Sequence, residues 1–150
     1  MENKTLVDIF VDGARKGWNV GINSILPNVL LAFALIQILK VTGLLTALGK
    51  IFGPFMAVFG LPGEAVTVLM GAWLSMGGGV GVAASLYTGK ILTATHVTIL
   101  LPAIILMGAQ IQYMGRLLGT AAVQTRYYPL LFGISILNAF LAMLIMRFVA

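Results

Sequence analysis

The sequence predicts an all-α integral membrane protein built from about four to five helical segments and one re-entrant helical hairpin. The 150 residues are 60% hydrophobic and only 9% charged, with a mean hydropathy of +1.06, whereas soluble domains carry about 25% charged residues. Uncharged runs extend over residues 17–39, 51–89, 91–115 and 127–146, and only Glu64 interrupts the second of them. Three runs suit one spanning helix of about 20 residues each, but the second is too long for one helix and too short for two. Its length therefore predicts two short arms, neither of which crosses the membrane completely.

The first 18 residues predict an interfacial amphipathic helix ahead of a membrane domain at residues 19–150. Leu6, Ile9 and Phe10 fall on one helical face, and charged residues occupy the rest of the surface, a pattern typical of helices that lie in the membrane interface. A solvated lead-in to the first span is the alternative. The segment lacks a short apolar core followed by a cleavage site, so it does not resemble a secretory signal peptide.

The first span is expected at residues 19–40 and contains Pro27. Proline removes a backbone hydrogen bond and frees a carbonyl, which a membrane helix tolerates where neighbouring groups or cavity water satisfy it. Asn28 stands beside this defect and is therefore a candidate solute-binding residue. A packing kink, with Asn28 bonded to another helix, is the alternative.

The hairpin is expected between residues 44 and 76. Residues 44–59 are about as long as a half-crossing and end at the turn Gly-Leu-Pro-Gly, residues 60–63. A second short helix can begin at Pro62, because proline is favoured in a first turn and Glu64 suits the positive end of the helix dipole. This helix is expected to run to about Met76, where three consecutive glycines, Gly77, Gly78 and Gly79, interrupt it.

Three further segments follow at residues 80–87, 93–113 and 129–146. The second carries Pro102 midway and His96 near its start, where a position at the headgroup level is expected and a proton relay is the alternative. The third carries an asparagine in its middle.

Seven motifs occur in an order that resembles a known family: GARKGWNVGINSILPNVL, TGLL, GLPGEA, LSMGGGVGVAAS, LLPAIILMG, QYMGRLLGTA and RYYP. Over nearly the full chain they resemble the YjiG-like bacterial inner-membrane proteins, relatives of spore maturation protein B with a nucleoside recognition or Gate domain. More distantly, the pattern resembles one repeat of the concentrative nucleoside transporters and the membrane part of ferrous iron transport protein B. The resemblance implies a multi-pass protein of the bacterial inner (cytoplasmic) membrane, with GLPGEA at the tip of a re-entrant hairpin.

In the nucleoside transporters a glutamate in the matching turn helps to hold the permeant, and the resemblance assigns that position to Glu64. This chain has Leu-Pro-Gly where those transporters have a polar turn, so the resemblance supports the hairpin more directly than a nucleoside substrate. A lone ionisable group at membrane depth costs about 2.5 to 3.5 kcal/mol and usually faces a cavity, which makes Glu64 a candidate solute ligand or proton carrier. A helix cap near the interface is the alternative.

The second candidate site is the predicted helix break at Ser75 and the three glycines, because such a break exposes backbone groups that coordinate ions or polar solutes. Close helix packing is the alternative explanation for the glycines. Gln110 and Gln112 could line a cavity mouth. The predicted solute-binding set is therefore Glu64, Asn28, Ser75, Gly77, Gly78, Gly79, Gln110 and Gln112, with no catalytic, cofactor-binding or metal-binding residues.

The composition argues against several other classes of protein. The net charge of +5 comes from Lys and Arg at the ends of the hydrophobic runs, where they act as membrane anchors rather than as a nucleic-acid footprint. The chain has no cysteine, so it has no disulfide or thiol chemistry. It has one histidine, no acid pair and no phosphate loop, so we do not expect an enzyme. No cofactor is expected beyond a possible coupling ion or proton.

Transporters of this kind often contain two inverted repeats with the solute site between them, and this chain supplies only about one. We therefore expect it to act as one half of an assembly that moves a small polar solute, nucleoside-like or other. By resemblance the partner is a spore maturation protein A-like (YjiH-like) protein, and a homo-oligomer is the alternative. A non-transporting membrane scaffold, with a role in the envelope or in spore maturation, is the alternative function.

Overall fold

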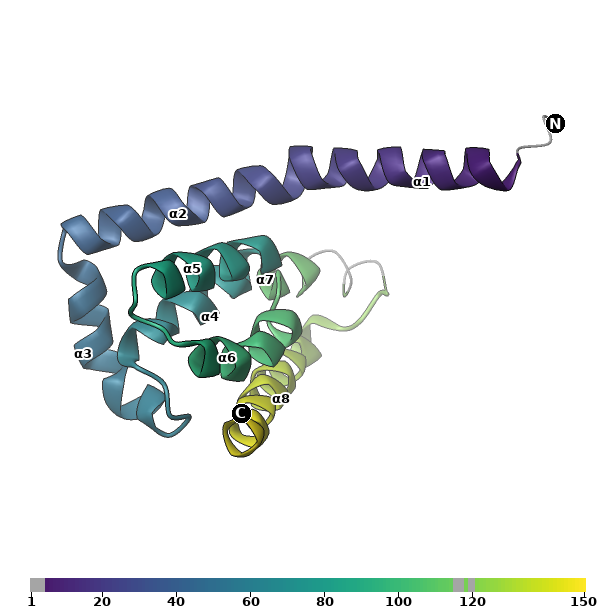
Figure 1. Ribbon diagram of the computed structural model, residues 1–150. Helices are drawn as coiled ribbons and strands as arrows, with labels where there is room; N and C mark the ends of the chain where they lie inside the picture. Colours follow the sequence, from purple (N-terminus) through teal and green to yellow (C-terminus); the bar gives the residue numbers. More distant parts are fainter. Residues whose placement is uncertain (1–4, 115–117, 119–120) are drawn as a thin grey trace.

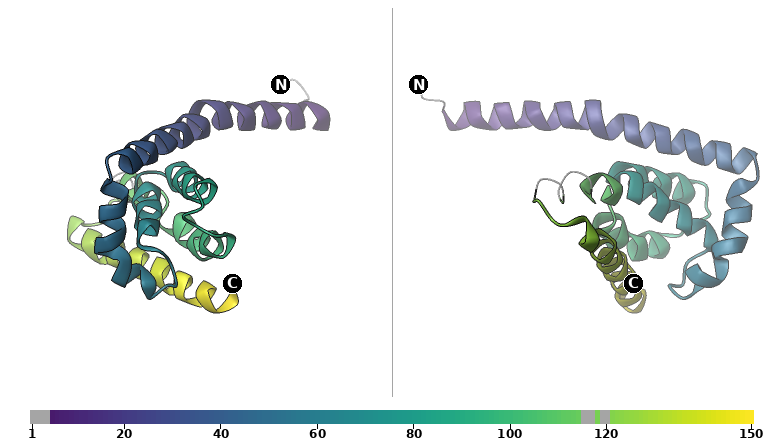
Figure 2. Two further views of the ribbon diagram at one scale, coloured as in Figure 1. Left: turned by 60° about the vertical axis from the view of Figure 1, so that its left-hand side comes forward. Right: turned by 180° about the vertical axis from the view of Figure 1, so that it is seen from behind.

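A computed structural model describes residues 5–114, 118 and 121–150. Within these residues the chain forms helices and turns and no strands. Figure 1 shows one long N-terminal helix lying over a compact bundle of shorter helices, with the first half of this helix extending beyond the bundle. The two further views in Figure 2 show the same separation between the free end of the long helix and the bundle.

The long helix consists of α1 (Leu6–Val20), a π-helical turn (Gly21–Ile25) and α2 (Leu26–Val41). A capping box starts it: Thr5 accepts a hydrogen bond from the Asp8 amide, and the Asp8 carboxylate accepts from the Thr5 hydroxyl and amide. These hydrogen bonds hold the pKa of the Asp8 carboxyl below its ordinary value. The helix continues through the expected boundary at residue 18, and α1 has no buried residue. Its place in the membrane interface stays a prediction.

The π-helical turn explains how the long helix tolerates Pro27. Pro27 lies in the first turn of α2, and the amide of Leu26 bonds back to the carbonyl of Gly21, five residues earlier. A π turn widens the helix by one residue, which makes room for a proline ring and for the carbonyl that it leaves without a donor.

The predicted hairpin is present, and its first arm is α3 (Leu44–Ala57). Gly43 has φ of +73° and turns the chain by 90° between α2 and α3. At the other end of α3, Gly60 has φ of +72°, its amide bonds to the Ala57 carbonyl, and the Leu61 amide bonds to the Met56 carbonyl. This Schellman motif, with a glycine in the left-handed region, ends the first arm and reverses the chain.

The second arm is a 3₁₀ turn (Gly63–Ala65) followed by α4 (Val66–Leu74). The two arms touch at Gly63: an alanine Cβ built there would stand 1.9 Å from the Gly49 carbonyl oxygen. The guanidinium of Arg147, near the C-terminus, donates to the Val58 carbonyl and connects α8 to the turn of the hairpin.

The break after α4 lies at Ser75, so its predicted position, at the three glycines, was wrong. Ser75 alone is extended, and α5 (Met76–Thr88) begins directly after it with all three glycines in its first two turns. The Ser75 hydroxyl accepts from the Gly78 amide at 2.8 Å, so the serine caps the new helix and the glycines stay helical. A Cβ on Gly79 would stand 2.9 Å from the Cα of Ala72. The glycines therefore let α4 and α5 fold closely against each other, which is the packing explanation.

The span expected at 93–113 is two helices, α6 (Ala94–Leu106) and α7 (Gln110–Tyr113). Residues 107–109 separate them, with Ala109 at φ of +58°. At the start of α6, Thr93 and His96 form a capping box, which agrees with a position of His96 at the beginning of a span. The last helix, α8 (Tyr128–Val149), follows a 3₁₀ turn (Thr125–Tyr127).

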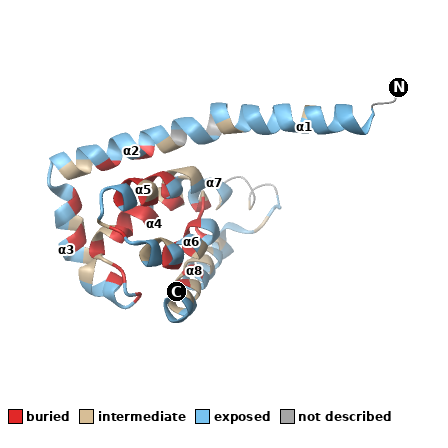
Figure 3. Ribbon diagram, viewed as in Figure 1, coloured by how far each residue is buried: buried red, intermediate tan, exposed pale blue. Residues whose placement is uncertain are grey.

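The core lies between the hairpin, α5, α6 and the inner face of α8, and its fully buried members include Met56, Leu86, Leu100 and Met143. Figure 3 shows this buried interior and the exposed surface of the long helix. Among the described residues, 94–113 and 125–149 are long and apolar enough to cross a membrane, and the bent pair α2–α3 could supply a third span. The predicted all-α membrane fold is confirmed.

Candidate functional site

Two helix breaks meet at one point of the bundle, which we call the break junction and define as residues 71–78 together with 107–112. The Ala109 amide donates to the Ala72 carbonyl at 2.8 Å. The Gln112 side-chain amide donates to the Leu74 carbonyl at 3.1 Å. These two carbonyls lie at the C-terminal end of α4, where helical partners are missing. The second break therefore satisfies the backbone groups that the first break exposes.

A cavity of about 250 Å³ opens beside the break junction, between α2 and the α4–α5 break. Predicted site residues from distant parts of the chain share its wall: Ser75, Gly78 and Gln112. The remaining lining is apolar and consists of Leu31, Ala32, Leu35, Gly71, Leu74 and Val82. The arrangement is a mostly apolar pocket with a few convergent polar groups, as small-molecule sites usually are.

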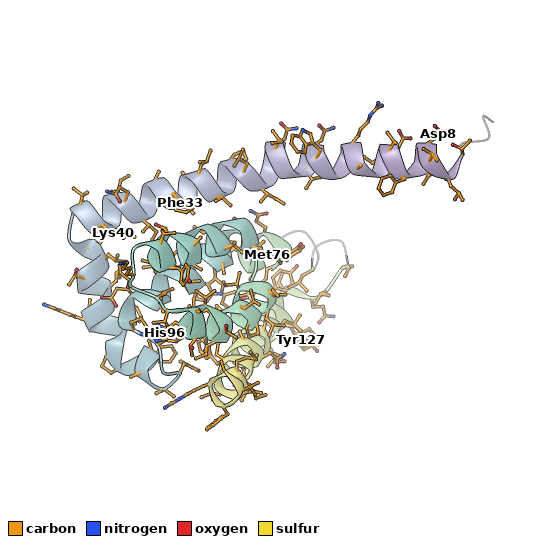
Figure 4. All side chains as sticks on the ribbon, in the orientation of Figure 1. Asp8, Phe33, Lys40, Met76, His96 and Tyr127 are labelled. Atoms are coloured by element: carbon orange, nitrogen blue, oxygen red, sulfur yellow. The ribbon has the colours of Figure 1, made fainter. Side chains whose placement is uncertain are left out.

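Three further members of the predicted solute-binding set are Gly77, Gly79 and Asn28. Gly77 is a helical residue of α5 outside the lining of this cavity, and Gly79 is buried against Ala72. The side chain of Asn28 lies outside the described part of the structure, although its near neighbours on α2 line the cavity. Figure 4 shows Met76 at the start of α5, beside α7, and places His96 away from it at the start of α6. His96 is therefore not part of the break junction.

Gln110 belongs to a buried polar chain on the other side of the junction. It is 7% exposed, its Oε1 accepts from the Trp73 indole N–H at 3.1 Å, and its Nε2 donates to the Ser135 hydroxyl. The three side chains link α4, α7 and α8. Trp73 and Ser135 were not predicted as site residues, because nothing in their local sequence distinguishes them from ordinary membrane-helix residues. A smaller cavity of about 160 Å³ lies against Gln110 and Ser135.

Replacing Gln110 with leucine is expected to destabilise the protein by about 1 to 3 kcal/mol. The change leaves the half-buried Trp73 indole N–H without its acceptor, whereas the Ser135 hydroxyl still donates to the Leu106 carbonyl, and one unsatisfied buried group costs about 1 to 3 kcal/mol. Thermal unfolding of the purified protein in detergent would measure the loss. The matched control is Gln37→Leu, on the exposed surface of α2, where a change within about 0.5 kcal/mol is expected. Equal melting temperatures for the two variants would contradict the role of the polar chain.

Glu64 lies at the tip of the hairpin, in the 3₁₀ turn before α4, and is half-buried. Its side chain rests on the backbone of α3: a Cβ on Gly49 would stand 2.5 Å from Glu64 Oε1. The Thr67 hydroxyl donates to the Glu64 carbonyl at 2.7 Å. Within the described residues the Glu64 carboxylate makes no hydrogen bond or ion pair. The carboxylate lies beside the N-terminal end of this short helix.

The structure therefore separates the predicted site residues into two groups. The nine residues of α4 rise about 14 Å, and Glu64 precedes this helix whereas Ser75 follows it. Ser75, Gly78 and Gln112 share one cavity, Gln110 lies on the far side of the same junction, and Glu64 stands alone at the hairpin tip.

Comparison with known proteins gives one family and one group of close relatives. Residues 22–121 match the model of the Gate family, described as nucleoside recognition. The chain is 51% identical over 146 residues to the inner membrane protein YjiG of Escherichia coli K12, covering 97% of this chain and 95% of the relative. The YjiG proteins of Escherichia coli O6:H1 and O157:H7 match equally well. No solved structure matches the chain significantly.

Proposed function

Because the chain belongs to the nucleoside-recognition (Gate) family and is an inner-membrane protein, we propose that it is a subunit of a secondary transporter for a small polar solute. One observation carries the proposal: two broken helices meet beside a cavity whose polar wall is formed by Ser75 and Gln112. Membrane transporters build solute sites from discontinuous helices of this kind, because the ends of the half-helices present polar backbone inside the bilayer.

The size and chemistry of the cavity define the class of solute. A volume of about 250 Å³ is slightly below the range of drug-sized sites, about 300 to 1,000 Å³. The wall offers a hydroxyl, a side-chain amide and apolar surface, and no charged side chain. These groups suit a small neutral solute with hydrogen-bonding groups and an apolar face, a description that includes a nucleoside or a nucleobase.

Glu64 has a second role in this proposal. Its distance from the break junction, about the length of α4, exceeds the reach of a solute held in a cavity of this size. We assign Glu64 to the coupling step, as the carrier of a proton or the ligand of a cation, and the solute to the break junction. A half-buried carboxylate without a partner in the described chain suits such a role, because membrane carboxylates commonly serve as proton relays or cation ligands.

The proposal makes the chain one half of a transporter. Transporter sites usually lie between two repeats, and the residues that the structure describes contain one hairpin and one break junction. A spore maturation protein A-like partner, suggested by the family resemblance, would supply the other half. Sizing the purified chain in lipid nanodiscs, alone and after co-expression with such a partner, tests this: a stable complex of both chains supports the proposal, and two separate species contradict it.

Solute binding is tested by thermal unfolding against a panel of uridine, adenosine, uracil and adenine at millimolar concentrations. A ligand present at 100 times its Kd stabilises the folded state by about 2.7 kcal/mol, so at least one compound should raise the melting temperature by several degrees. Replacing Gln112 with alanine should remove this shift in melting temperature, because the change removes the only side-chain amide in the cavity wall among the described residues. Gln37→Ala changes the same residue type outside the cavity and should retain the shift.

An equal ligand shift in both variants would contradict binding at the break junction. No shift with any compound would contradict the proposed solute class and favour the scaffold role.

A further inference from the structure

The outer face of α8 carries a feature that the transport proposal does not explain. Residues 125–149 form the longest apolar helix that the structure describes, and only 11% of its most apolar stretch is buried inside the protein. The inner face packs through Ala139 and Met143, both fully buried, and through Phe140, whose ring meets Phe55 at 5.3 Å. The opposite face has no partner within the described residues.

The exposed side chains on this face follow a seven-residue repeat. Leu131, Ile134, Asn138, Leu141, Ile145 and Phe148 are separated alternately by three and four residues, and all six are exposed. The five apolar members expose between 39% and 86% of their surface. We call these six residues the outer seam. A repeat of three and four can keep one stripe of a helix against a second helix over its whole length. Leu130 and Leu137, outside the seam, are exposed as well, so the choice of the seam depends on Asn138.

Asn138 lies at the centre of the outer seam and identifies what covers it. It is exposed near the middle of α8 and makes no hydrogen bond within the described residues. In the hydrocarbon region a side-chain amide without a partner is unfavourable. The amide is both donor and acceptor, so a second Asn138, brought opposite by a two-fold axis, satisfies it. A single asparagine in such a repeat also fixes the register of two paired helices.

We propose that two copies of this chain associate through the outer seams of α8, parallel and in register, with the two Asn138 side chains hydrogen-bonded across a two-fold axis. Copies inserted with the same orientation have an axis along the membrane normal, which makes the paired helices parallel. Apart from Leu131, which also lines the cavity of about 160 Å³ against Gln110 and Ser135, the seam lies on the opposite side of α8 from the core, and no residue of α8 lines the cavity of about 250 Å³, so pairing leaves that cavity unchanged. The proposal does not depend on transport: each copy keeps its own junction.

Disulfide trapping tests the surface directly, because the chain has no cysteine. Single substitutions Ile134→Cys, Leu141→Cys and Ile145→Cys are placed in the full chain, oxidised in native membranes and resolved without reductant. Each should give a dimer, since in-register parallel helices bring identical seam positions together. Gly133→Cys is the matched control: Gly133 is exposed on α8 outside the seam, with nothing within 4 Å of its Cβ position, and should stay monomeric.

The trapping pattern can also overturn the proposal. Dimers at Gly133 as strong as those on the seam, a dimer at Leu141→Cys alone as in antiparallel pairing, or attachment to a different protein would each contradict it. Absence of any dimer would contradict it equally.

The role of Asn138 is tested by sedimentation of the purified chain in detergent. Asn138→Leu should weaken the dimer by about three- to thirty-fold, the range measured for hydrogen bonds between membrane helices. Asn138→Gln keeps the donor and the acceptor and should retain most of the association. Unchanged association in Asn138→Leu would overturn the hydrogen-bonded pair.

Discussion

Replacing Gly63 with alanine is expected to prevent the hairpin from forming, with a loss of more than about 3 kcal/mol of stability. Overpacking a well-packed site typically costs about 1 to 3 kcal/mol, and more where nothing can move aside. The added Cβ would stand 1.9 Å from the Gly49 carbonyl oxygen and 2.7 Å from its carbon. Both atoms belong to the backbone of α3, so the clash is relieved only by moving one arm of the hairpin away from the other.

The effect of Gly63→Ala is measured as the amount of monodisperse protein extracted from membranes and as the melting temperature of that protein. Gly17→Ala, in the interior of α1, is the matched control, because a Cβ there meets nothing within 4 Å and no proline follows it. In a helix interior the control should stabilise by about 0.5 to 1 kcal/mol. If the Gly63→Ala protein had the same melting temperature as the control, the two arms would not be in contact at Gly63.

The hairpin itself was predictable from the sequence, because its signals are local. The length of the uncharged run, too long for one span and too short for two, indicates two short arms. The turn between the arms is indicated by residues close to one another, a proline expected in a first turn and the glycines of GLPG. Gly60 and Gly43 occupy the left-handed region, where glycine is favoured. Helix ends therefore fall close to where the turn residues place them.

The break junction was not predictable, because it depends on contacts between distant segments. The break between α6 and α7 has one weak local signal, Gly108, and the positive φ falls on Ala109. The three glycines after Ser75 were expected to end a helix, yet a serine cap keeps them helical and close packing against α4 uses their missing side chains. A glycine inside a membrane helix has the same sequence signature whether it breaks the helix or packs it.

The position of Glu64 depends both on local turn residues and on a contact between segments distant in the sequence. The turn places it at the start of a short helix, which local rules anticipate. Its contact with Gly49, fifteen residues earlier in the sequence, comes from the crossing of the two arms. Gly49 therefore belongs with Glu64 as a positioning residue, although no local feature of the sequence indicates it.

Replacing Glu64 with glutamine is expected to abolish transport while leaving the protein folded in the membrane. The two side chains have nearly the same shape, and the carboxylate makes no described hydrogen bond or ion pair that the change would break, so stability should change by less than about 1 kcal/mol. The amide cannot carry a proton or balance the charge of a cation. Uptake into proteoliposomes of the solute found by thermal unfolding would measure the loss, and uptake equal to the unmodified protein would exclude Glu64 from the coupling step.

A double-mutant cycle with Gly49 tests the position of Glu64 without any transported solute. In Gly49→Ala the new Cβ meets the carboxylate at 2.5 Å and its carbon at 2.6 Å, and both belong to the movable end of a side chain. The carboxylate is expected to be displaced, so Gly49→Ala should lower the melting temperature in the unmodified protein and not in Glu64→Ala. Residues in direct contact show coupling energies of about 0.5 to 3 kcal/mol in such cycles. Additive effects would show that the carboxylate does not rest on α3, and the coupling role would then lose its structural basis even if the solute binds at the junction.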